Sequence, residues 1–431
     1  MKQRHICLIN DSFPPVTDGV ANAVVNYAKN LTDDGYCATA VTPAYPDADD
    51  TQFAFPVVRY PSVDLTKLVG YHAGLPFSSQ TLETLCERNF DLIHCHCPVT
   101  SAMLARALRD RIHVPLVFTY HTKFDIDIAN AIKGKLLQEE AKRVLVDNIT
   151  ACDEVWTVSR GAGENLKSLG YQGDYLVMPN GVDFPKGRVE EDLVREVTKD
   201  FDLPADVPMF LFVGRMMWYK GLRIILDALK ELQTQGVRFR MVFVGNGADR
   251  EEVIAYTQKL GLSDCVFFTA PAYDRNVIRA WYCRADLFLF PSTFDTNGLV
   301  VREAAACGLG SVLVRGSCAA EDITDGESGF LIEENAPSMA KMLASLCKNR
   351  EAMKAVGLGA QREIYISWTD AVRRAEQRYE IVLENFRAGK YPEHTRLSDE
   401  AFHAISSYLS AVGRRQEKLK LRLEELSERF L

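Results

Sequence analysis

Two carboxylates, Asp295 and Glu303, are the residues of this sequence with the clearest chemical meaning. They lie in Pro291–Gly310, where a polar loop follows a short apolar run and leads into Leu299–Cys307, which has the pattern of a short helix. Carboxylates accept hydrogen bonds from paired hydroxyls, so this stretch has the groups to hold a sugar on one side and a ribose on the other. The free amides at the predicted helix start suit an anion, above all a phosphate. They belong to Asn297, Gly298, Leu299 and Val300.

A second set of chemically meaningful residues is cationic. Arg215 and Lys220 follow the apolar run Met209–Val213, in a loop bounded by Gly214 and Gly221. A guanidinium and an ammonium in one strand-to-helix loop can both reach a diphosphate and neutralise it as a metal ion would. The loop therefore predicts a clamp that stabilises a departing diphosphate.

The first half of the chain contributes a histidine and a glycine. His121 comes directly after the buried-strand pattern Leu116–Thr119, which places it where it can hydrogen-bond a ligand. Gly19 lies in the loop after the first apolar run, and its missing side chain lets the backbone approach a ligand closely. A tight turn without a ligand is the alternative for Gly19.

Two short segments have the composition of metal sites. His94–Cys97 alternates histidine and cysteine, but on an extended segment the two histidines share one side and the two cysteines the other. Asp125 and Asp127 have the spacing of a divalent-metal pair, for which we favour contact with an acceptor or simple solvation. No metal site is therefore expected in either segment.

The elements that must position these residues alternate between strand-like and helix-like patterns in both halves. This alternation predicts an α/β protein with two Rossmann-like domains, whose ligands gather at the carboxyl ends of parallel strands. The three-glycine dinucleotide fingerprint is absent. We expect an N-terminal domain over residues 1–195, a second domain over 205–366, a long helix over 367–388 and a helical tail over 389–431.

Taken together, the motifs resemble those of the GT4 family of retaining glycosyltransferases, which have the GT-B fold of two Rossmann-like domains facing across a cleft. Asp295 and Glu303 match the family's carboxylate-x7-glutamate signature, with Asp where the family usually has Glu. Arg215 and Lys220 match its Arg-x4-Lys motif. The resemblance covers roughly residues 5–388, and in GT-B proteins the long helix crosses back onto the first domain.

The resemblance implies a nucleotide-sugar donor, most naturally UDP-linked, bound mainly by the second domain. It places Glu303 on the ribose, the two cations on the diphosphate, and Asp295 with the amides of Asn297–Leu299 on the sugar and phosphate. Further donor-binding residues are then Gly214 beside the cations, Gly245 and Asn246 beside the base, His121 near the reacting carbon, and Gly19. It implies no metal cofactor and no enzymic nucleophile, because the departing phosphate helps to deprotonate the acceptor.

The acceptor is the least determined part of the prediction. Tyr120-His121-Thr122 resembles a run found in lipid-directed members such as diacylglycerol glucosyltransferases, so we expect glucose to be moved to a membrane lipid. A saccharide acceptor is the close alternative. A sugar-nucleotide epimerase and a catalytically silent binding module are further alternatives, whereas the missing fingerprint disfavours a dinucleotide-dependent oxidoreductase.

Composition limits the remaining classes of function. The formal net charge of −8 argues against nucleic-acid binding, and the 11 scattered cysteines indicate reduced thiols. The N-terminus shows no signal-peptide pattern, so we expect a cytoplasmic protein, with peripheral contact to the inner face of the cell membrane as one hypothesis. One candidate for that contact is Ile128–Val146, which we expect to be one helix with several Lys and Arg residues. The basic helical tail is the other candidate. The alternative for the tail is a helical hairpin that docks on the body of the protein.

Overall fold

The structure is a computed structural model that describes residues 3–16, 18–66, 72–272 and 274–391, together with Phe402, Ala404 and Tyr408. The chain divides into two compact units, one of Met1–Pro179 with Val372–Leu431 and one of Asn180–Ala371. The expected tail, residues 389–431, lies outside the described residues apart from 389–391 and the three single residues just named.

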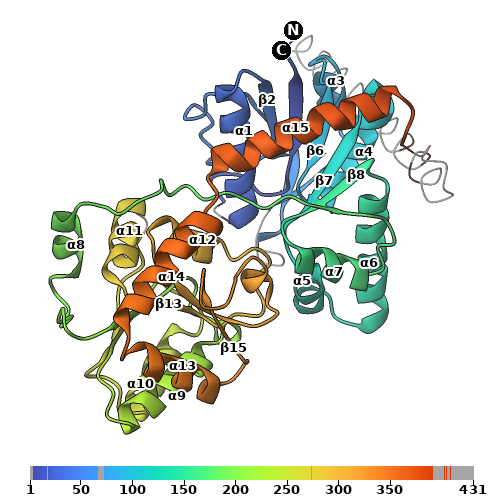
Figure 1. The fold of residues 1–431 in the computed structure, drawn as a ribbon. Coiled ribbons are helices and arrows are strands. Elements are labelled where there is room, and N and C mark those ends of the chain that lie inside the picture. Colours follow the sequence, from blue (N-terminus) through green and yellow to red (C-terminus); the bar gives the residue numbers. More distant parts are fainter. Residues whose placement is uncertain are drawn as a thin grey trace, which may run out of the picture. The chain divides into compact units, whose positions relative to one another are not determined.

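The first unit is built on a parallel sheet. Its strands are nearly continuous apolar runs, as expected where helices cover both faces of a sheet and neither face is in contact with water. In the described part of the chain this sheet has 7 strands in the order β3-β2-β1-β6-β7-β8-β9. Figure 1 labels β2, β6, β7 and β8 of this sheet. The strands are β1 (His5–Ile9), β2 (Cys37–Pro43), β3 (Val57–Tyr60), β6 (Leu92–Cys95), β7 (Leu116–Tyr120), β8 (Glu154–Thr157) and β9 (Leu176–Val177). A separate antiparallel pair consists of β4 (Ser62–Asp64) and β5 (His72–Gly74).

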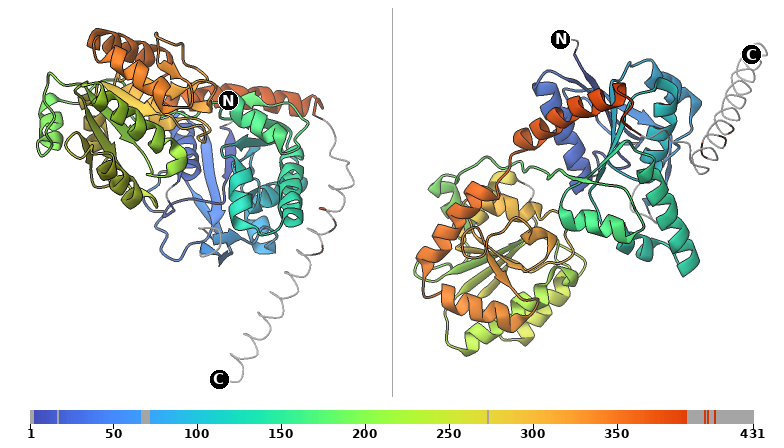
Figure 2. Two further views of the ribbon diagram at one scale, coloured as in Figure 1. Left: turned by 90° about the horizontal axis from the view of Figure 1, so that it is seen from below. Right: turned by 45° about the vertical axis from the view of Figure 1, so that its right-hand side comes forward.

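Helices cover both faces of the first sheet. They are α1 (Gly19–Asp33), α3 (Ser79–Cys86), α4 (Thr100–Ile112), α5 (Phe124–Ala131), α6 (Lys135–Thr150), α7 (Arg160–Ser168) and, from Val372 on, α15 (Trp368–Arg387). Buried side chains of α3, α4, α6 and α7 form one core with the strands. On the other face, Tyr27 of α1 packs edge-on to His94, and Tyr379 of α15 stacks on Trp156. Figures 1 and 2 show the red helix α15 lying along this unit.

The expectation of a single helix over Ile128–Val146 was wrong. The structure has two helices, α5 and α6, separated by residues 132–134. Gly134 has a φ of 102°, which no α-helical residue adopts, so the chain turns there.

The second unit repeats the design of the first with a sheet of 6 strands in the order β12-β11-β10-β13-β14-β15 among the described residues. The strands are β10 (Met209–Val213), β11 (Arg240–Val244), β12 (Val266–Phe268), β13 (Leu287–Phe290), β14 (Ser311–Val314) and β15 (Phe330–Ile332). Its helices are α8 (Glu191–Thr198), η1 (Trp218–Lys220), α9 (Leu222–Thr234), α10 (Arg250–Lys259), α11 (Arg275–Arg284), α12 (Leu299–Ala306), η2 (Cys318–Ala320), α13 (Ala336–Leu346) and α14 (Arg350–Glu363).

The second unit begins at Asn180, earlier than residue 195, where the expected first domain ended. The amide of Val182 donates to the carbonyl of Ile366, and that of Gly187 donates to the carbonyl of Ala306. Phe184 lies in the buried core of this unit. These partners are far along the chain, so residues 180–190 join the second unit for reasons that no local pattern contains.

The strand registers bring the polar loops of each unit to one edge of its sheet. In the first unit Ile9 pairs with Cys95 and Cys95 pairs with Phe118, so the loops beginning at Asn10, His96 and His121 leave the same edge. In the second unit the parallel strands β11, β10 and β13 are neighbours. The loops that follow these three strands carry the predicted donor-binding residues.

Candidate active site

An ion pair between Lys220 and Asp295 joins two loops of the second unit. Nζ of Lys220 donates to Oδ1 of Asp295 over 2.6 Å, and Oγ of Ser292 donates to Oδ2 over 2.5 Å. The Lys220 side chain is buried, and the Asp295 carboxylate compensates its charge. The short Asp295 side chain therefore reaches the cation of the neighbouring loop and holds it.

Glycines allow these loops to pack closely. Gly221 has a φ of 76°, and a Cβ there would lie 2.5 Å from the carbonyl oxygen of Pro291. A Cβ on Gly245 would lie 2.2 Å from the carbonyl oxygen of Gly214, and the amide of Met216 donates to the carbonyl of Asn246 over 2.8 Å. The three loops that follow β11, β10 and β13 thus form one packed layer at the carboxyl edge of the sheet.

Arg215 differs from Lys220 in its surroundings. Its side chain is exposed and forms no hydrogen bond or ion pair among the described residues. An exposed guanidinium with no partner can bind an anion without first breaking an ion pair. The two predicted cations therefore differ. Lys220 is held in an ion pair with Asp295, whereas Arg215 has no partner in the described structure.

The first turn of α12 supplies backbone donors. Gly298 is the N-cap of this helix in the left-handed conformation with a φ of 58°, and no side chain caps the helix start in the described structure. The Gly298 carbonyl accepts from Val301, while the amides of Leu299 and Val300 lie in the first turn, where no intrahelical carbonyl reaches them. Asn297, just before the cap, is buried. A helix start with free amides is suited to an anion, and binding there stays a prediction.

Glu303 is met by a cation that the sequence did not single out. Nη2 of Arg275 donates to Oε1 of Glu303 over 2.8 Å, and the hydroxyl of Tyr282 donates to Oε2 over 3.1 Å. Burial raises the pKa of the Glu303 carboxyl, and the Arg275 guanidinium opposes that rise. Arg275 also lies 3.7 Å from Asp183. Nothing in the local sequence distinguishes Arg275 from the other basic residues of α11, because its partner comes from another element.

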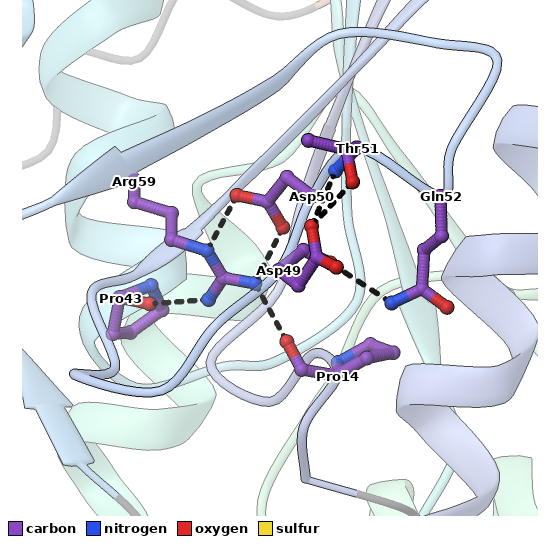
Figure 3. A network of polar contacts seen from close by, with 7 residues as sticks. All are labelled: Pro14, Pro43, Asp49, Asp50, Thr51, Gln52 and Arg59. Carbon is purple, nitrogen blue, oxygen red and sulfur yellow. Dashed lines mark hydrogen bonds and ion pairs between the residues drawn. The ribbon is translucent and has the colours of Figure 1, made fainter.

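In the first unit, the loop that leads to Gly19 is anchored by Arg59 (Figure 3). Nη2 of Arg59 donates to the Pro14 carbonyl over 2.6 Å, and two of its nitrogens bind the Asp50 carboxylate at 2.7 and 2.8 Å. Asp18 caps α1 by accepting from the amides of Val20 and Ala21. A Cβ on Gly19 would meet nothing within 4 Å, so packing within the described chain does not require a glycine there.

His121 belongs to a cluster of three buried histidines. Its Nε2 lies 3.0 Å from Nδ1 of His96, whose ring is 4.0 Å from that of His94. His94 is held at both nitrogens, by Tyr379 at 2.6 Å and Thr119 at 2.7 Å. Burial lowers the pKa of His121 to about 3, and it holds the pKa values of His94 and His96 well below their usual range. All three imidazoles are therefore neutral at pH 7.

The two segments with metal-like composition would need convergent ligands to hold a metal ion. Among the described residues, no group of three or more His, Cys, Asp or Glu side chains could hold a metal ion. His94 of β6 and His96 just after it do lie close together, but both nitrogens of His94 and Nδ1 of His96 bind the protein partners given above. Asp125 accepts a hydrogen bond from Asn165 at 3.5 Å, while the side chain of Asp127 lies outside the described residues.

Two parallel-sheet units with polar loops at the carboxyl edge of each sheet define a protein of GT-B fold, and solved structures agree. Sucrose-phosphate synthase from Thermosynechococcus elongatus is similar over 89% of this chain and 100% of its own, with a TM-score of 0.70 and 19% identity. HepE of Anabaena in complex with UDP is similar over 88% of this chain and 100% of its own, with a TM-score of 0.70 and 18% identity. At these identities the likeness establishes the fold alone.

Comparison of the sequence with known families identifies the family. Residues 17–185 match Glycosyltransferase Family 4, and residues 194–363 match Glycosyl transferases group 1. The chain therefore belongs to the group 1, GT4 glycosyltransferases, a retaining family whose members transfer a sugar from a nucleotide sugar. The expected family, fold class and class of enzyme are confirmed.

Curated relatives differ in the acceptor that their names give. The alpha-monoglucosyldiacylglycerol synthase of Streptococcus pneumoniae is 22% identical over 70% of this chain and 69% of its own length. The D-inositol 3-phosphate glycosyltransferase 2 of Catenulispora acidiphila is 28% identical over 70% of this chain and 74% of its own. In the described part of the chain, no helix has the length and apolarity that crossing a membrane requires.

Proposed function

We propose that this glycosyltransferase moves glucose from UDP-glucose to a hydroxyl of a membrane lipid such as diacylglycerol, with retention at the anomeric carbon. The observation that carries the proposal is the layer of three loops in the second unit, where Arg215, Lys220 and the start of α12 offer positive charge and amide donors at one sheet edge. Such a layer suits a nucleotide diphosphate.

In this proposal the charges act on the leaving group. Arg215 and Lys220 neutralise the diphosphate as the bond to the sugar breaks, so no metal ion is needed for that charge. Asp295 shares Lys220 with the phosphates and accepts from sugar hydroxyls, while the amides of Asn297, Gly298, Leu299 and Val300 donate to sugar and phosphate oxygens. Glu303 accepts from the ribose hydroxyls.

The remaining donor contacts are proposed from the loops at the edge of each sheet. Gly214 gives the backbone room beside the diphosphate, and the Gly245-Asn246 turn lies beside the base. His121 and Gly19 act from the first unit, on the sugar and on the phosphate.

A lipid acceptor is supported by the surface of α6. Leu136 is 86% exposed and Leu137 is 63% exposed in the first turn of this helix, where large apolar side chains are unusual in contact with water. Lys133 and Lys135 beside them form no ion pair among the described residues, whereas Lys142 is paired with Glu139. Cations at a helix start oppose the helix dipole, so an anionic surface outside the protein would stabilise them.

The test is incubation of the purified chain with a panel of nucleotide sugars and a lipid extract, followed by mass analysis of the products. A hexosyl lipid formed only with UDP-glucose is the expected result, and NMR of its anomeric proton would show the α-configuration of the donor retained. A soluble glycoside and no glycolipid would instead support a soluble acceptor such as a saccharide, and the inositol phosphate in the names of several relatives is also a soluble polyol acceptor. An altered nucleotide sugar formed without any acceptor would support an epimerase.

A further inference from the structure

Two aromatic side chains lie next to the Lys220–Asp295 ion pair in the second unit. Tyr219 directly precedes Lys220 in η1, and Phe294 directly precedes Asp295 in the loop after β13. The centroids of the Tyr219 and Phe294 rings are 4.6 Å apart, with an angle of 50° between the ring planes. The two loops are therefore joined twice, once by a pair of charges and once by a pair of rings.

The ring of Tyr219 is more accessible than the ion pair beside it. The side chains of Lys220 and Asp295 are 10% and 24% exposed, whereas 42% of Tyr219 is exposed. The Tyr219 hydroxyl has no hydrogen-bond partner in the part of the chain that the structure describes. Binding sites for small molecules combine aromatic side chains with a few polar groups, so an accessible ring beside these charges is suited to contact with a ligand.

Tyr219 and its neighbour Trp218 face different elements. The indole nitrogen of Trp218 donates to Glu252 over 3.0 Å, and the Trp218 ring meets that of Tyr256 at 5.8 Å, so Trp218 faces α10. Helix α10 follows β11, and the turn between them is the one we propose to lie beside the base. Tyr219 instead faces the loop that carries Asp295. Its ring therefore lies on the side of η1 where the sugar is proposed to bind.

A hexose presents two kinds of surface to a protein. Its hydroxyls donate hydrogen bonds, which a carboxylate such as that of Asp295 accepts. The carbon-bound hydrogens of the pyranose chair form an apolar face with a slight positive charge, and the face of an aromatic ring carries the complementary negative charge. Tyr219 and Asp295 together offer a partner for each kind of surface.

We propose that Tyr219 is a specificity-determining residue for the donor: its ring packs against the C–H face of the transferred hexose, and Phe294 holds that ring beside Asp295. This inference rests on the proposed function, because it takes a nucleotide sugar to lie along the loops after β10 and β13. It assigns Tyr219 to the sugar and not to the nucleotide. Free UDP therefore binds without contact to this ring.

The experiment compares the binding of UDP and of UDP-glucose to the full chain by calorimetric titration. The ratio of the two dissociation constants isolates the sugar, because a disturbance of Lys220 acts through the diphosphate that both ligands share. We expect Tyr219→Ala to weaken UDP-glucose by about tenfold relative to UDP, as for the loss of a base stacked on an aromatic ring. Tyr219→Phe keeps the ring, so its ratio should stay within about threefold of the wild type. An unchanged ratio in Tyr219→Ala would overturn the proposal.

Two further variants test how specific the effect is. Phe294→Leu removes the ring that holds Tyr219 but keeps an apolar side chain, and it should weaken UDP-glucose by about threefold relative to UDP. An unchanged ratio in this variant would remove Phe294 from the proposal. Tyr408→Ala is the control, because Tyr408 is a 69% exposed tyrosine outside the second unit. It should bind both ligands as the wild type does.

The outcomes separate this inference from the proposed function. If both ligands bind and Tyr219→Ala leaves their ratio unchanged, the inference fails and the proposed donor stands. If the ratio changes as expected but no lipid is glycosylated, the role of Tyr219 stands and the proposed acceptor fails. If neither UDP nor UDP-glucose binds to the wild type, both fail.

Discussion

At the scale of single residues, each carboxylate of the motif is paired with a cation from another element. Asp295 binds Lys220 of η1, and Glu303 binds Arg275 of α11. The first partner was itself a predicted site residue, although the sequence did not predict that the two would touch. The second partner was missed. Each pair places a cation beside a carboxylate of the motif, so neither carboxylate is an isolated anion.

The two cations of the loop after β10 are expected to differ when removed. Arg215→Ala should lower kcat/KM by about 10²- to 10³-fold without changing stability, because the side chain is exposed and has no partner in the described structure. Lys220→Ala should cost activity and also about 1–3 kcal/mol of stability, because it leaves Asp295 without its cation. Donor turnover and urea unfolding measure the two effects. Full activity in either variant would remove the proposed diphosphate clamp.

Arg275 should control how donor binding depends on pH. Burial raises the pKa of Glu303, and Arg275 lowers it. As pH falls through this pKa, Glu303 gains a proton and loses acceptor capacity, so affinity for UDP should decline on the acid side. Arg275→Met removes the positive charge that lowers the pKa of Glu303. The loss of UDP affinity on the acid side should therefore begin at a higher pH, with a smaller change in Arg275→Lys.

Calorimetric titration of UDP between pH 5 and 8 measures this limb. Arg238→Met is the control, because Arg238 pairs with Asp206 on the exposed surface of the same unit. An identical pH profile in Arg275→Met and Arg238→Met would show that Glu303 does not bind the nucleotide.

At the scale of elements, the loops of the candidate site pack so closely at several glycines that a residue with a side chain would not fit there. Gly221 faces the Pro291 carbonyl, Gly245 faces the Gly214 carbonyl, and Gly298 lies against Ala319. These contacts join the loops that follow four neighbouring strands, β11, β10, β13 and β14, so a change in one loop should affect the residues of the next.

Gly221→Ala should therefore disturb the Lys220–Asp295 pair. Gly236 has nearly the same φ, 75° against 76°, but a Cβ there would meet nothing within 4 Å. Gly236→Ala should cost only about 1–2 kcal/mol of backbone strain, whereas Gly221→Ala adds a clash with backbone atoms. We expect a larger loss of stability and a weaker affinity for UDP only in Gly221→Ala. Equal effects of the two substitutions on both measurements would show that the close packing is unimportant.

At the scale of the whole molecule, a formal net charge of −8 repels an anionic membrane. Attachment to such a surface would therefore depend on a local patch. The patch we propose is the first turn of α6, with Lys135, Leu136 and Leu137, together with Lys133 just before the helix. No such patch could be recognised from the net charge.

The double substitution of Leu136 and Leu137 by Glu should weaken binding to vesicles of anionic phospholipid by about tenfold or more, because it removes two apolar anchors and adds two like charges. Co-sedimentation measures the binding. Leu358→Glu, at a leucine of α14 that is 62% exposed, is the matched control and should bind as the wild type does. Equal co-sedimentation of both variants would leave the lipid acceptor without support from α6.

The sequence by itself determined the α/β class, the family and the loops that carry the motif residues, because these depend on signals within short windows: apolar runs, glycines and the spacing of charged residues. Only the tertiary structure decided that Arg275 meets Glu303, that His96 meets His121, that the second unit starts at Asn180, and that the chain breaks at Gly134 between α5 and α6. Three of these four depend on contacts between residues far apart in the chain. Such contacts are fixed by strand register and helix packing, which act over distances that no local pattern records.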